Sequence, residues 1–324
     1  MIIMKKAVVI GGGSWGGALA SAIAKNIGKS FILTSSSTRS EEINRGNSTI
    51  ISKNCLGSEI IAGTVSKEIL HDASLIIIAT EVKRTLSFCD DIKKYSPEKT
   101  AVLIASKGFS DDGQVLPVAL KSKLKKRSVG VLSGPSFANE VIEEKPTALV
   151  VAGTKHLIEL STEILHTNKL RIYGSSDDVG TSVSGAMKNV IAIASGIVFG
   201  LELGENARAA ILTRGLAETS RLAVGLGGKI ETVFGLAGAG DMALSCLSST
   251  SRNFSWGYSL AKSQNTQNVL VEGINAAKVA MFNANKLKIE LPITELVAKA
   301  SQSNLDLTVE VQRMLERPPK LEWK

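Results

Sequence analysis

Lys188 is the residue of this sequence whose setting most favours proton chemistry, because it interrupts a mostly small and apolar stretch from Ser184 to Ala194. A lysine is rarely buried without a partner, and a partly desolvated amine can exchange a proton near neutral pH. Such an amine could protonate a carbonyl oxygen during a reduction. Helical periodicity alone instead favours an exposed position on an amphipathic helix. The residues of this stretch therefore leave two interpretations open, a proton donor and a surface lysine.

A glycine-rich turn follows the apolar run from Ala7 to Ile10 and precedes a segment with helical spacing. Its G-x-G-x-x-G pattern, in this position between strand and helix, is typical of dinucleotide binding. Gly11 permits the tight turn, Gly13 lets the backbone approach a pyrophosphate, and Gly16 lets the helix pack closely on the strand. Free N–H groups at the start of the helix would face that phosphate. We predict a dinucleotide site here; the alternative is a glycine-rich turn without a ligand.

The residues after the second apolar run bear on the choice of cofactor. NAD-specific sites usually carry an acidic residue there, which bonds the ribose 2′-OH. This chain has Ser35, Ser36, Ser37, Thr38 and Arg39, and no acidic residue before Glu41. Hydroxyls and a guanidinium suit a 2′-phosphate better than a carboxylate would. We therefore predict that NADP(H) is preferred and NAD(H) possible, the alternative being a polar loop that contacts neither.

Two loops in the second half of the chain carry further polar groups. Asp241 ends a glycine-rich segment that no predicted strand precedes, so we do not interpret that segment as a second dinucleotide site. Its carboxylate could hold Lys188 or a hydroxyl group. Arg252 and Asn253, next to Ser251, are suitable phosphate ligands because a cationic fork stands beside an amide donor. Taken alone, each of these residues would more often be an ordinary loop residue.

The elements that must position these residues change in character near residue 178. Before it, short apolar runs alternate with helical stretches, at 7–10, 31–34, 75–80, 101–106, 129–132, 147–152 and 170–173. After it, only helical patterns occur, at 182–199, 207–226, 255–262, 275–285 and 293–302. The alternation predicts an α/β fold with a doubly wound, Rossmann-like, mostly parallel sheet. We expect a dinucleotide-binding domain over 1–177, a mostly α-helical substrate-binding and catalytic domain over 178–324, and the site in the cleft between them.

Composition narrows the possible partners and compartment. The net charge of +8 favours anionic partners. The densest basic run, 121–127, lacks the aromatic residues of a single-strand nucleic-acid site, so a solvated helix face and no nucleic-acid partner are expected. Three cysteines at wide spacing, with three scattered histidines, indicate neither a disulfide framework nor a metal site. We expect a cytoplasmic protein without signal peptide or membrane insertion, since the longest apolar helix candidate is shorter than the about 20 residues of a membrane span.

The motifs together resemble those of bacterial NAD(P)-dependent glycerol-3-phosphate dehydrogenases along nearly the whole chain. Ten motifs stand in the family's order, at 11–16, 106–108, 133–138, 185–192, 206–208, 213–218, 238–241, 251–253, 271–273 and 291–294. The resemblance implies an oxidoreductase that reversibly reduces dihydroxyacetone phosphate to sn-glycerol 3-phosphate with NAD(P)H. It also implies a supply of glycerol 3-phosphate for phospholipid synthesis and a homodimer.

The resemblance assigns roles to individual residues. Lys188 matches the proton-transferring lysine, which Asp241 positions, and Lys107 matches a lysine that touches both substrate and cofactor. Substrate contacts are implied for Lys107, Gly134, Ser136, Lys188, Asp241, Ser251, Arg252 and Asn253. Cofactor contacts are implied for Ser14, Trp15, Lys107, Ala138, Arg252, Leu270 and Glu272, in addition to Gly11, Gly13, Gly16, Ser36 and Arg39. Asn189 and Ser245 match polar positions near the reacting carbon.

One departure from the family stands in the loop after the run at 75–80. Glu81 occupies a place where relatives commonly have a neutral polar residue, so its carboxylate could weaken nicotinamide binding or pair with Lys83. Two other functions remain open. A related NADP-dependent hydroxy-acid dehydrogenase would not need Arg252, and a non-catalytic NADPH-binding module would bind cofactor without turning over a triose phosphate. A basic nucleic-acid-binding protein is the remaining alternative.

Overall fold

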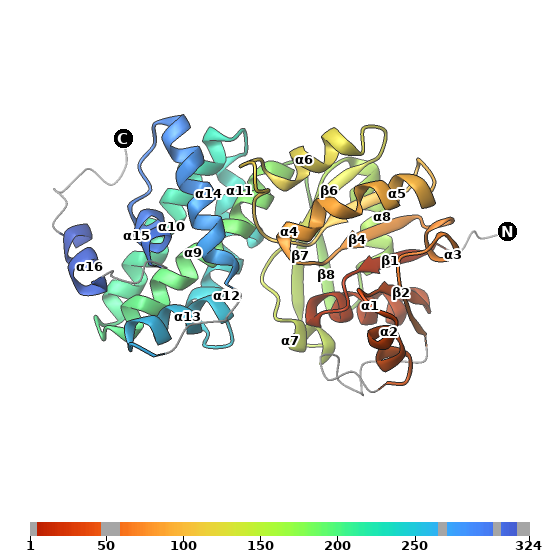
Figure 1. Ribbon diagram of the computed structural model, residues 1–324, viewed down its shortest axis with the longest axis horizontal. Coiled ribbons are helices and arrows are strands. Elements are labelled where there is room, and N and C mark those ends of the chain that lie inside the picture. The colour runs from red at the N-terminus through yellow and green to blue at the C-terminus, as the bar shows by residue number, and fades with distance from the viewer. Residues whose placement is uncertain (1–4, 47–58, 265–270, 301–305, 316–324) are drawn as a thin grey trace.

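The molecule consists of a sheet half and a helical half that lie side by side in Figure 1. The computed structural model describes residues 5–46, 59–264, 271–300 and 306–315. The last strand of the sheet half ends at Ser175, and the first helix of the helical half begins at Asp178. The change in pattern near residue 178 therefore coincides with a change from sheet to helices.

Eight strands of the described residues form one sheet in the order β3-β2-β1-β4-β5-β6-β7-β8. They are β1 Ala7–Ile10, β2 Ser30–Leu33, β3 Ile60–Gly63, β4 Leu75–Ile78, β5 Ala101–Ile104, β6 Val129–Ser133, β7 Thr147–Ala152 and β8 Leu170–Ser175. All neighbouring pairs are parallel except β6 with β7. The predicted mostly parallel, doubly wound sheet is confirmed. Strand β3 was not predicted, although three of its four residues are apolar.

Alternate residues of the strands enter two separate cores, one on each face of the sheet. Ala7 and Val9 belong to one core, and Val8 and Ile10 belong to the other. Burial on both faces explains why the strands are continuous apolar runs rather than alternating ones. The helices of this half are α1 Ser14–Ile27, α2 Ser37–Asn44, α3 Lys67–Leu70, α4 Val82–Thr85, η2 Leu86–Phe88, α5 Cys89–Tyr95, α6 Leu116–Lys123, α7 Ala138–Ile142 and α8 Lys155–Leu165.

Helix α9, Asp178–Gly200, is the centre of the helical half. Around it lie α10 Glu205–Gly225, α11 Ile230–Phe234, the π-helix η3 Leu236–Gly240, α12 Asp241–Leu247, α13 Arg252–Ala261, α14 Glu272–Leu287, α15 Pro292–Lys299 and α16 Leu307–Leu315. By length and composition α9 could cross a membrane, but 89% of its apolar window is buried inside the protein. It is therefore the core helix of this half.

Two glycines let α13 approach α9 at backbone distance. A Cβ on Gly196 would lie 2.1 Å from the carbonyl oxygen of Phe254, and a Cβ on Gly257 would lie 2.2 Å from that of Ile193. Any larger residue at either position would separate the helices. This contact fixes the start of α13 relative to the middle of α9, and so sets where Arg252 lies with respect to Lys188.

The basic run 121–127 is only partly a solvated helix face. Helix α6 ends at Lys123, and Lys121 pairs with Asp178 of the helical half. Arg127 is not a solvated residue, which corrects the expectation for this position. Its guanidinium donates to the carbonyl oxygens of Ile92 at 3.1 Å and Ser96 at 3.0 Å, so it satisfies the C-terminal end of α5.

Candidate active site

Asp241 lies between two lysine amines where the two halves of the molecule meet. Its Oδ2 accepts a hydrogen bond from Lys107 Nζ at 2.5 Å, and its Oδ1 lies 3.2 Å from Lys188 Nζ. The Asp241 side chain is 1% exposed, and the two lysine side chains are 14% and 15% exposed. Oδ1 accepts no hydrogen bond within the described part of the chain, so it meets Lys188 as an ion pair only. Helical periodicity left open whether Lys188 is a proton donor or a surface lysine. These contacts show that it is not a surface lysine.

Each amine of the cluster has a second partner. Lys188 donates to Ser245 Oγ at 2.9 Å, and Lys107 donates to the carbonyl oxygen of Gly134 at 3.3 Å. Burial lowers the pKa of Lys107; the Asp241 carboxylate opposes this shift, and the charge of Lys188 adds to it. Two amines share one carboxylate, so the cluster carries an excess of positive charge that suits an anionic substrate or a developing alkoxide.

A π-helix presents Asp241 to the two lysines. Within η3 the N–H of Gly240 donates to the carbonyl oxygen of Gly235 at 3.2 Å, five residues back. A Cβ on Gly238 would lie 2.0 Å from the carbonyl oxygen of Val233, so only glycine fits there. Asp241 then begins α12, and Ser245 follows one turn later on the same face. Isolated π turns inside helices are frequent at functional sites.

Arg252 and Asn253 begin α13, which Ser251 caps by accepting from the N–H of Phe254 at 3.4 Å. Arg252 is exposed. Asn253 donates from Nδ2 to Asn189 Oδ1 at 3.0 Å and accepts at Oδ1 from the N–H of Gly273 at 3.1 Å. One amide hydrogen of Asn253 remains for a ligand. The residue therefore also ties together α9, α13 and α14.

Glu272 adds a carboxylate to the rim of the cluster from the first turn of α14. Burial raises its pKa; Arg252, Lys188 and Lys107 oppose that shift, and Glu81 of the sheet half reinforces it. Charged groups of both halves therefore act on this carboxylate. Glu81 also pairs with Lys83 at 3.2 Å, which confirms one of the two consequences expected for that departure from the family.

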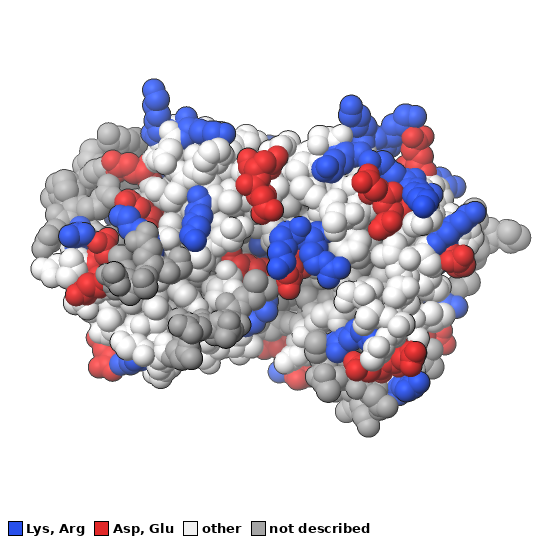
Figure 2. All heavy atoms as spheres, in the orientation of Figure 1, with Lys and Arg blue, Asp and Glu red and all other residues white. Residues whose placement is uncertain are grey.

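The carboxyl ends of β1, β4, β5 and β6 lie at one edge of the sheet because these strands are parallel neighbours. The segments that follow them carry, in turn, the glycine-rich turn, Glu81, Lys107 and Gly134. This edge faces the helical half, and Figure 2 shows basic side chains over the junction of the two halves. The glycine turn and the lysine cluster therefore belong to one site.

The glycine-rich turn has the backbone geometry that its spacing predicts. Gly11 has a φ of +130°, and a Cβ there would lie 2.3 Å from the carbonyl oxygen of Ala79. A Cβ on Gly16 would lie 1.8 Å from the carbonyl oxygen of Gly11, whereas the space around Gly13 is open within 4 Å. In the described structure α1 has neither a side-chain cap nor an acidic residue in its first turn. The free N–H groups and the open side at Gly13 fit the pyrophosphate of a dinucleotide.

Residues predicted to contact the rest of the dinucleotide lie around this turn. Arg39 donates to the carbonyl oxygen of Gly12 at 3.3 Å and pairs with Glu42 at 3.3 Å, and Ser36 caps α2. The indole Nε1 of Trp15 is buried and has no hydrogen-bond partner among the residues described. The remaining predicted contacts are Ser14, exposed at the start of α1, Ala138, which begins α7, and Leu270, which lies outside the described residues.

Two buried serines were not singled out from the sequence. Ser133 ends β6 and Ser184 lies one turn before Lys188 on α9. Neither hydroxyl finds a hydrogen-bond partner in the described ranges, although both are buried. The spacing of four between Ser184 and Lys188 was the available signal. Ser136 was predicted, and its hydroxyl donates to the carbonyl oxygen of Gly134 at 3.1 Å.

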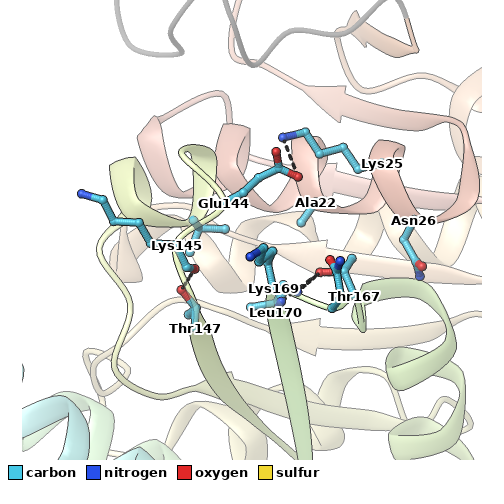
Figure 3. Close-up of a pocket in the computed structure, with 11 residues that line it drawn as sticks. Ala22, Lys25, Asn26, Glu144, Lys145, Thr147, Thr167, Lys169 and Leu170 are labelled. Carbon is cyan, nitrogen blue, oxygen red and sulfur yellow. Dashed lines mark hydrogen bonds and ion pairs between the residues drawn. The ribbon is translucent and has the colours of Figure 1, made fainter.

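A separate surface cavity of about 250 Å³ lies away from this cluster. Figure 3 shows it between α1, α7 and the beginnings of β7 and β8, with the Lys25–Glu144 ion pair at 3.3 Å on its rim. Its charged side chains are exposed, and no predicted site residue lines it. The buried amines that share the Asp241 carboxylate lie in the lysine cluster instead, so the chemistry is assigned there.

The glycine turn at the switch point of a doubly wound sheet, opposite a buried amine–carboxylate cluster on a helical half, defines an NAD(P)-dependent dehydrogenase. The family model for the N-terminus of NAD-dependent glycerol-3-phosphate dehydrogenase matches residues 6–158, and the model for its C-terminus matches residues 177–312. The chain belongs to the NAD-dependent glycerol-3-phosphate dehydrogenase family.

Curated relatives match over nearly their whole length. Glycerol-3-phosphate dehydrogenase (NAD(P)+) of Neisseria meningitidis is 36% identical over 98% of this chain and 100% of the relative. That of Listeria monocytogenes is 35% identical over 98% of both chains. Among solved structures, glycerol-3-phosphate dehydrogenase from Coxiella burnetii has a TM-score of 0.91 at 32% identity and covers 97% of this chain and 100% of its own. D-mandelate dehydrogenase has a TM-score of 0.63 at 12% identity over 95% of this chain and 99% of its own, a likeness of fold alone.

Proposed function

We propose that the chain reduces dihydroxyacetone phosphate reversibly to sn-glycerol 3-phosphate with NAD(P)H, the activity that its relatives' names state. The observation that carries this proposal is the Lys107–Asp241–Lys188 cluster, which stands at the sheet edge that also holds the glycine turn. A buried amine with a fixed carboxylate partner is what a carbonyl oxygen needs as it receives a proton. The excess positive charge of the cluster also suits a phosphorylated substrate.

In this proposal, each residue of the site has a separate role in the reduction. A reduced nicotinamide, when bound, would supply the hydride for C2 of the substrate. The Lys188 ammonium donates its proton to the C2 oxygen, while Asp241 and Ser245 hold the amine in place. In the reverse direction the neutral Lys188 amine accepts the hydroxyl proton. Arg252 and the remaining amide hydrogen of Asn253 hold the phosphate, which orients C2.

Lys107 and its neighbours complete the substrate site in this proposal. The Lys107 ammonium, which also lies against the carbonyl oxygen of Gly134, contacts both substrate and cofactor. Ser136 and Ser251 contact the substrate near its phosphate. Water is excluded as the two halves enclose the reacting atoms, which strengthens every electrostatic contact inside.

The proposed cofactor preference is NADP(H). Support comes from Arg39, whose guanidinium lies against the glycine turn, and from the absence of an acidic residue between Ser35 and Thr38. A 2′-phosphate would pair with Arg39 and accept from the Ser36 hydroxyl. The ratio of kcat/KM for NADPH to that for NADH measures the preference. Equal values would contradict it.

Four further statements are part of the proposal. Residues 1–177 and 178–324 act as two domains, a division supported by the end of β8 at Ser175 and the start of α9 at Asp178. The enzyme works in the cytoplasm, where the free thiols of Cys89 and Cys246 would stay reduced. It forms a homodimer, and exposed apolar residues such as Leu247, 60% exposed, offer a surface for it. Its product supplies phospholipid synthesis.

The test follows NADPH and NADH absorbance in parallel with dihydroxyacetone phosphate, using the wild type and Lys188→Ala. The variant should lose about 10²–10⁴-fold in kcat, because it lacks the general acid. Its affinity for NADPH should change little, since the glycine turn is untouched. Near-normal turnover by the variant would remove Lys188 from its role. A wild type that ignores dihydroxyacetone phosphate but oxidises a hydroxy acid, with little loss in Arg252→Met, would establish the alternative dehydrogenase.

A further inference from the structure

The segment that follows Lys107 belongs by sequence to the sheet half but packs in the helical half. We call residues 107–115, which link β5 to α6, the strap. Phe109 is 1% exposed and Val115 is 5% exposed, and both lie in the apolar core that α9 organises. The two residues pair with each other through an antiparallel bridge. Because Phe109 and Val115 are both buried in that core, the strap packs as part of the helical half.

Helix α14 contacts the strap at Gly113. Near the end of α14, Asn283 Nδ2 donates to the carbonyl oxygen of Gly113 at 2.9 Å, and both groups are buried. The ring of Phe282 lies so close to Gly113 that a Cβ there would be 2.9 Å from it. At the start of α14, Glu272 interacts electrostatically with Lys107. The end of α14 therefore contacts the strap at Gly113.

Hydrogen bonds within the strap join its residues, so that a contact at Gly113 restrains the conformation of the rest of the strap. Ser110 Oγ donates to Asp112 Oδ1 at 2.6 Å, and the N–H of Gly113 donates to the carbonyl oxygen of Ser110 at 3.0 Å. Gln114 Nε2 donates to Asp112 Oδ2 at 2.6 Å. Gly113 adopts a φ of +87°, a conformation that a compact turn of this kind requires.

We propose that Asn283 is a positioning residue for the reaction, which anchors the strap and thereby holds the Lys107 ammonium against Asp241. The proposal rests on the function proposed above. Lys107 follows β5 and contacts Gly134 of the sheet half, but the strap beyond it is packed in the half that carries Lys188 and Asp241. The glycine turn belongs to the sheet and does not depend on the strap.

The test is a double-mutant cycle of Asn283→Ala with Lys107→Met, read as kcat and KM for dihydroxyacetone phosphate and as Kd for NADPH. Asn283→Ala alone should lower kcat/KM about tenfold, and in the Lys107→Met background it should change kcat/KM less than about twofold, because the two residues act through one interaction. The Kd for NADPH should change less than kcat/KM does in Asn283→Ala. Thr219→Val is the matched control, since it removes a buried hydroxyl that donates to the carbonyl oxygen of Gly215 in α10, away from the strap.

The outcomes separate this inference from the proposed function. A tenfold loss that persists in the Lys107→Met background, or an equal loss in Thr219→Val, would show a general structural effect and overturn the inference. Unchanged kinetics in Asn283→Ala would overturn it as well. If Asn283→Ala does not fold, Phe282→Ala takes its place in the same cycle, since that side chain is 48% exposed and its loss leaves the core intact. A wild type that does not reduce dihydroxyacetone phosphate would refute the proposed function instead.

Discussion

Replacement of Asp241 by asparagine removes the one carboxylate that two buried amines share. The side chain keeps its size, so packing around α12 is preserved and only the charge changes. Lys107 at 2.5 Å and Lys188 at 3.2 Å would then lose the carboxylate that pairs with both of them. Asp241→Asn therefore isolates the electrostatic part of the cluster.

The distances set the size of the effect. At an effective dielectric constant near 20, each pair attracts by about 5–7 kcal/mol before the cost of desolvation is subtracted. Removal of one partner from a buried ion pair destabilises a protein by about 3–5 kcal/mol, because the remaining charge stays buried and uncompensated. We expect a loss in the free energy of unfolding of that order at pH 7. We also expect kcat for dihydroxyacetone phosphate to fall steeply, since Lys188 loses its fixed orientation.

The loss should depend on pH. Burial already lowers the pKa of Lys107, and Asp241 opposes that shift, so the substitution lowers the pKa of Lys107 further. Between this value and the unfolded value of about 10.4, the unfolded chain binds more protons than the folded chain, and stability rises with pH. The destabilisation by Asp241→Asn should therefore be largest near neutral pH and shrink as the pH approaches that of free lysine.

Urea denaturation at pH 7 and at pH 9.5 measures both effects. Asp90→Asn is the control, because Asp90 pairs with Lys93 at 2.7 Å while its side chain is 91% exposed. An exposed pair of this kind contributes little, so the control should unfold like the wild type at both pH values. The reasoning is refuted if Asp241→Asn loses no more stability than the control, or if its loss stays constant with pH.

Three other predictions follow from buried contacts. Gly13→Ala should fold normally but weaken NADPH binding at least about tenfold, since its Cβ would enter only the space proposed for the phosphate. Gly16→Ala should fail to fold, because its Cβ would lie 1.8 Å from a backbone carbonyl oxygen. Thermal melts and cofactor titration distinguish the two variants. Glu218→Gln should lower the free energy of unfolding by about 2–3 kcal/mol, as measured by urea denaturation. The Glu218 side chain is 1% exposed, and its carboxylate accepts hydrogen bonds from two backbone N–H groups at the start of α15 and from the Thr294 hydroxyl. Burial raises the pKa of Cys246 to about 12, so its thiol should react with a disulfide reagent at pH 8 only after unfolding, and rapid labelling of the native protein would contradict this.

Much of the sheet half could be predicted from the sequence because its signals are local. A strand buried on both faces must be apolar throughout, as β1 and β4 are, and a turn with a φ of +130° favours glycine at position 11. Strand β3 was not predicted although three of its four residues are apolar, since so short an apolar run does not by itself distinguish a strand from another element.

The roles at the lysine cluster were assigned by resemblance, and periodicity alone pointed the other way for Lys188. A lysine at one position of an apolar helix is solvated or buried according to what packs against that face. Helix α9 is covered on nearly every side, and η3 brings a carboxylate to it from 53 positions further along the chain. The predicted solvation of Arg127 was wrong for the same reason, since its carbonyl partners belong to a different helix.

The sequence by itself therefore determined most of the strands, the helical character of the second half, where the phosphate-binding turn lies, and which family the motifs resemble. Local backbone conformation and the burial pattern of single elements suffice for those conclusions. Only the tertiary structure decided which charged side chains contact each other. It also showed that Asn253 makes two hydrogen bonds within the protein and that the strap after β5 packs with the helical half. These contacts join residues far apart in the chain, and their energies depend on burial that no single segment encodes.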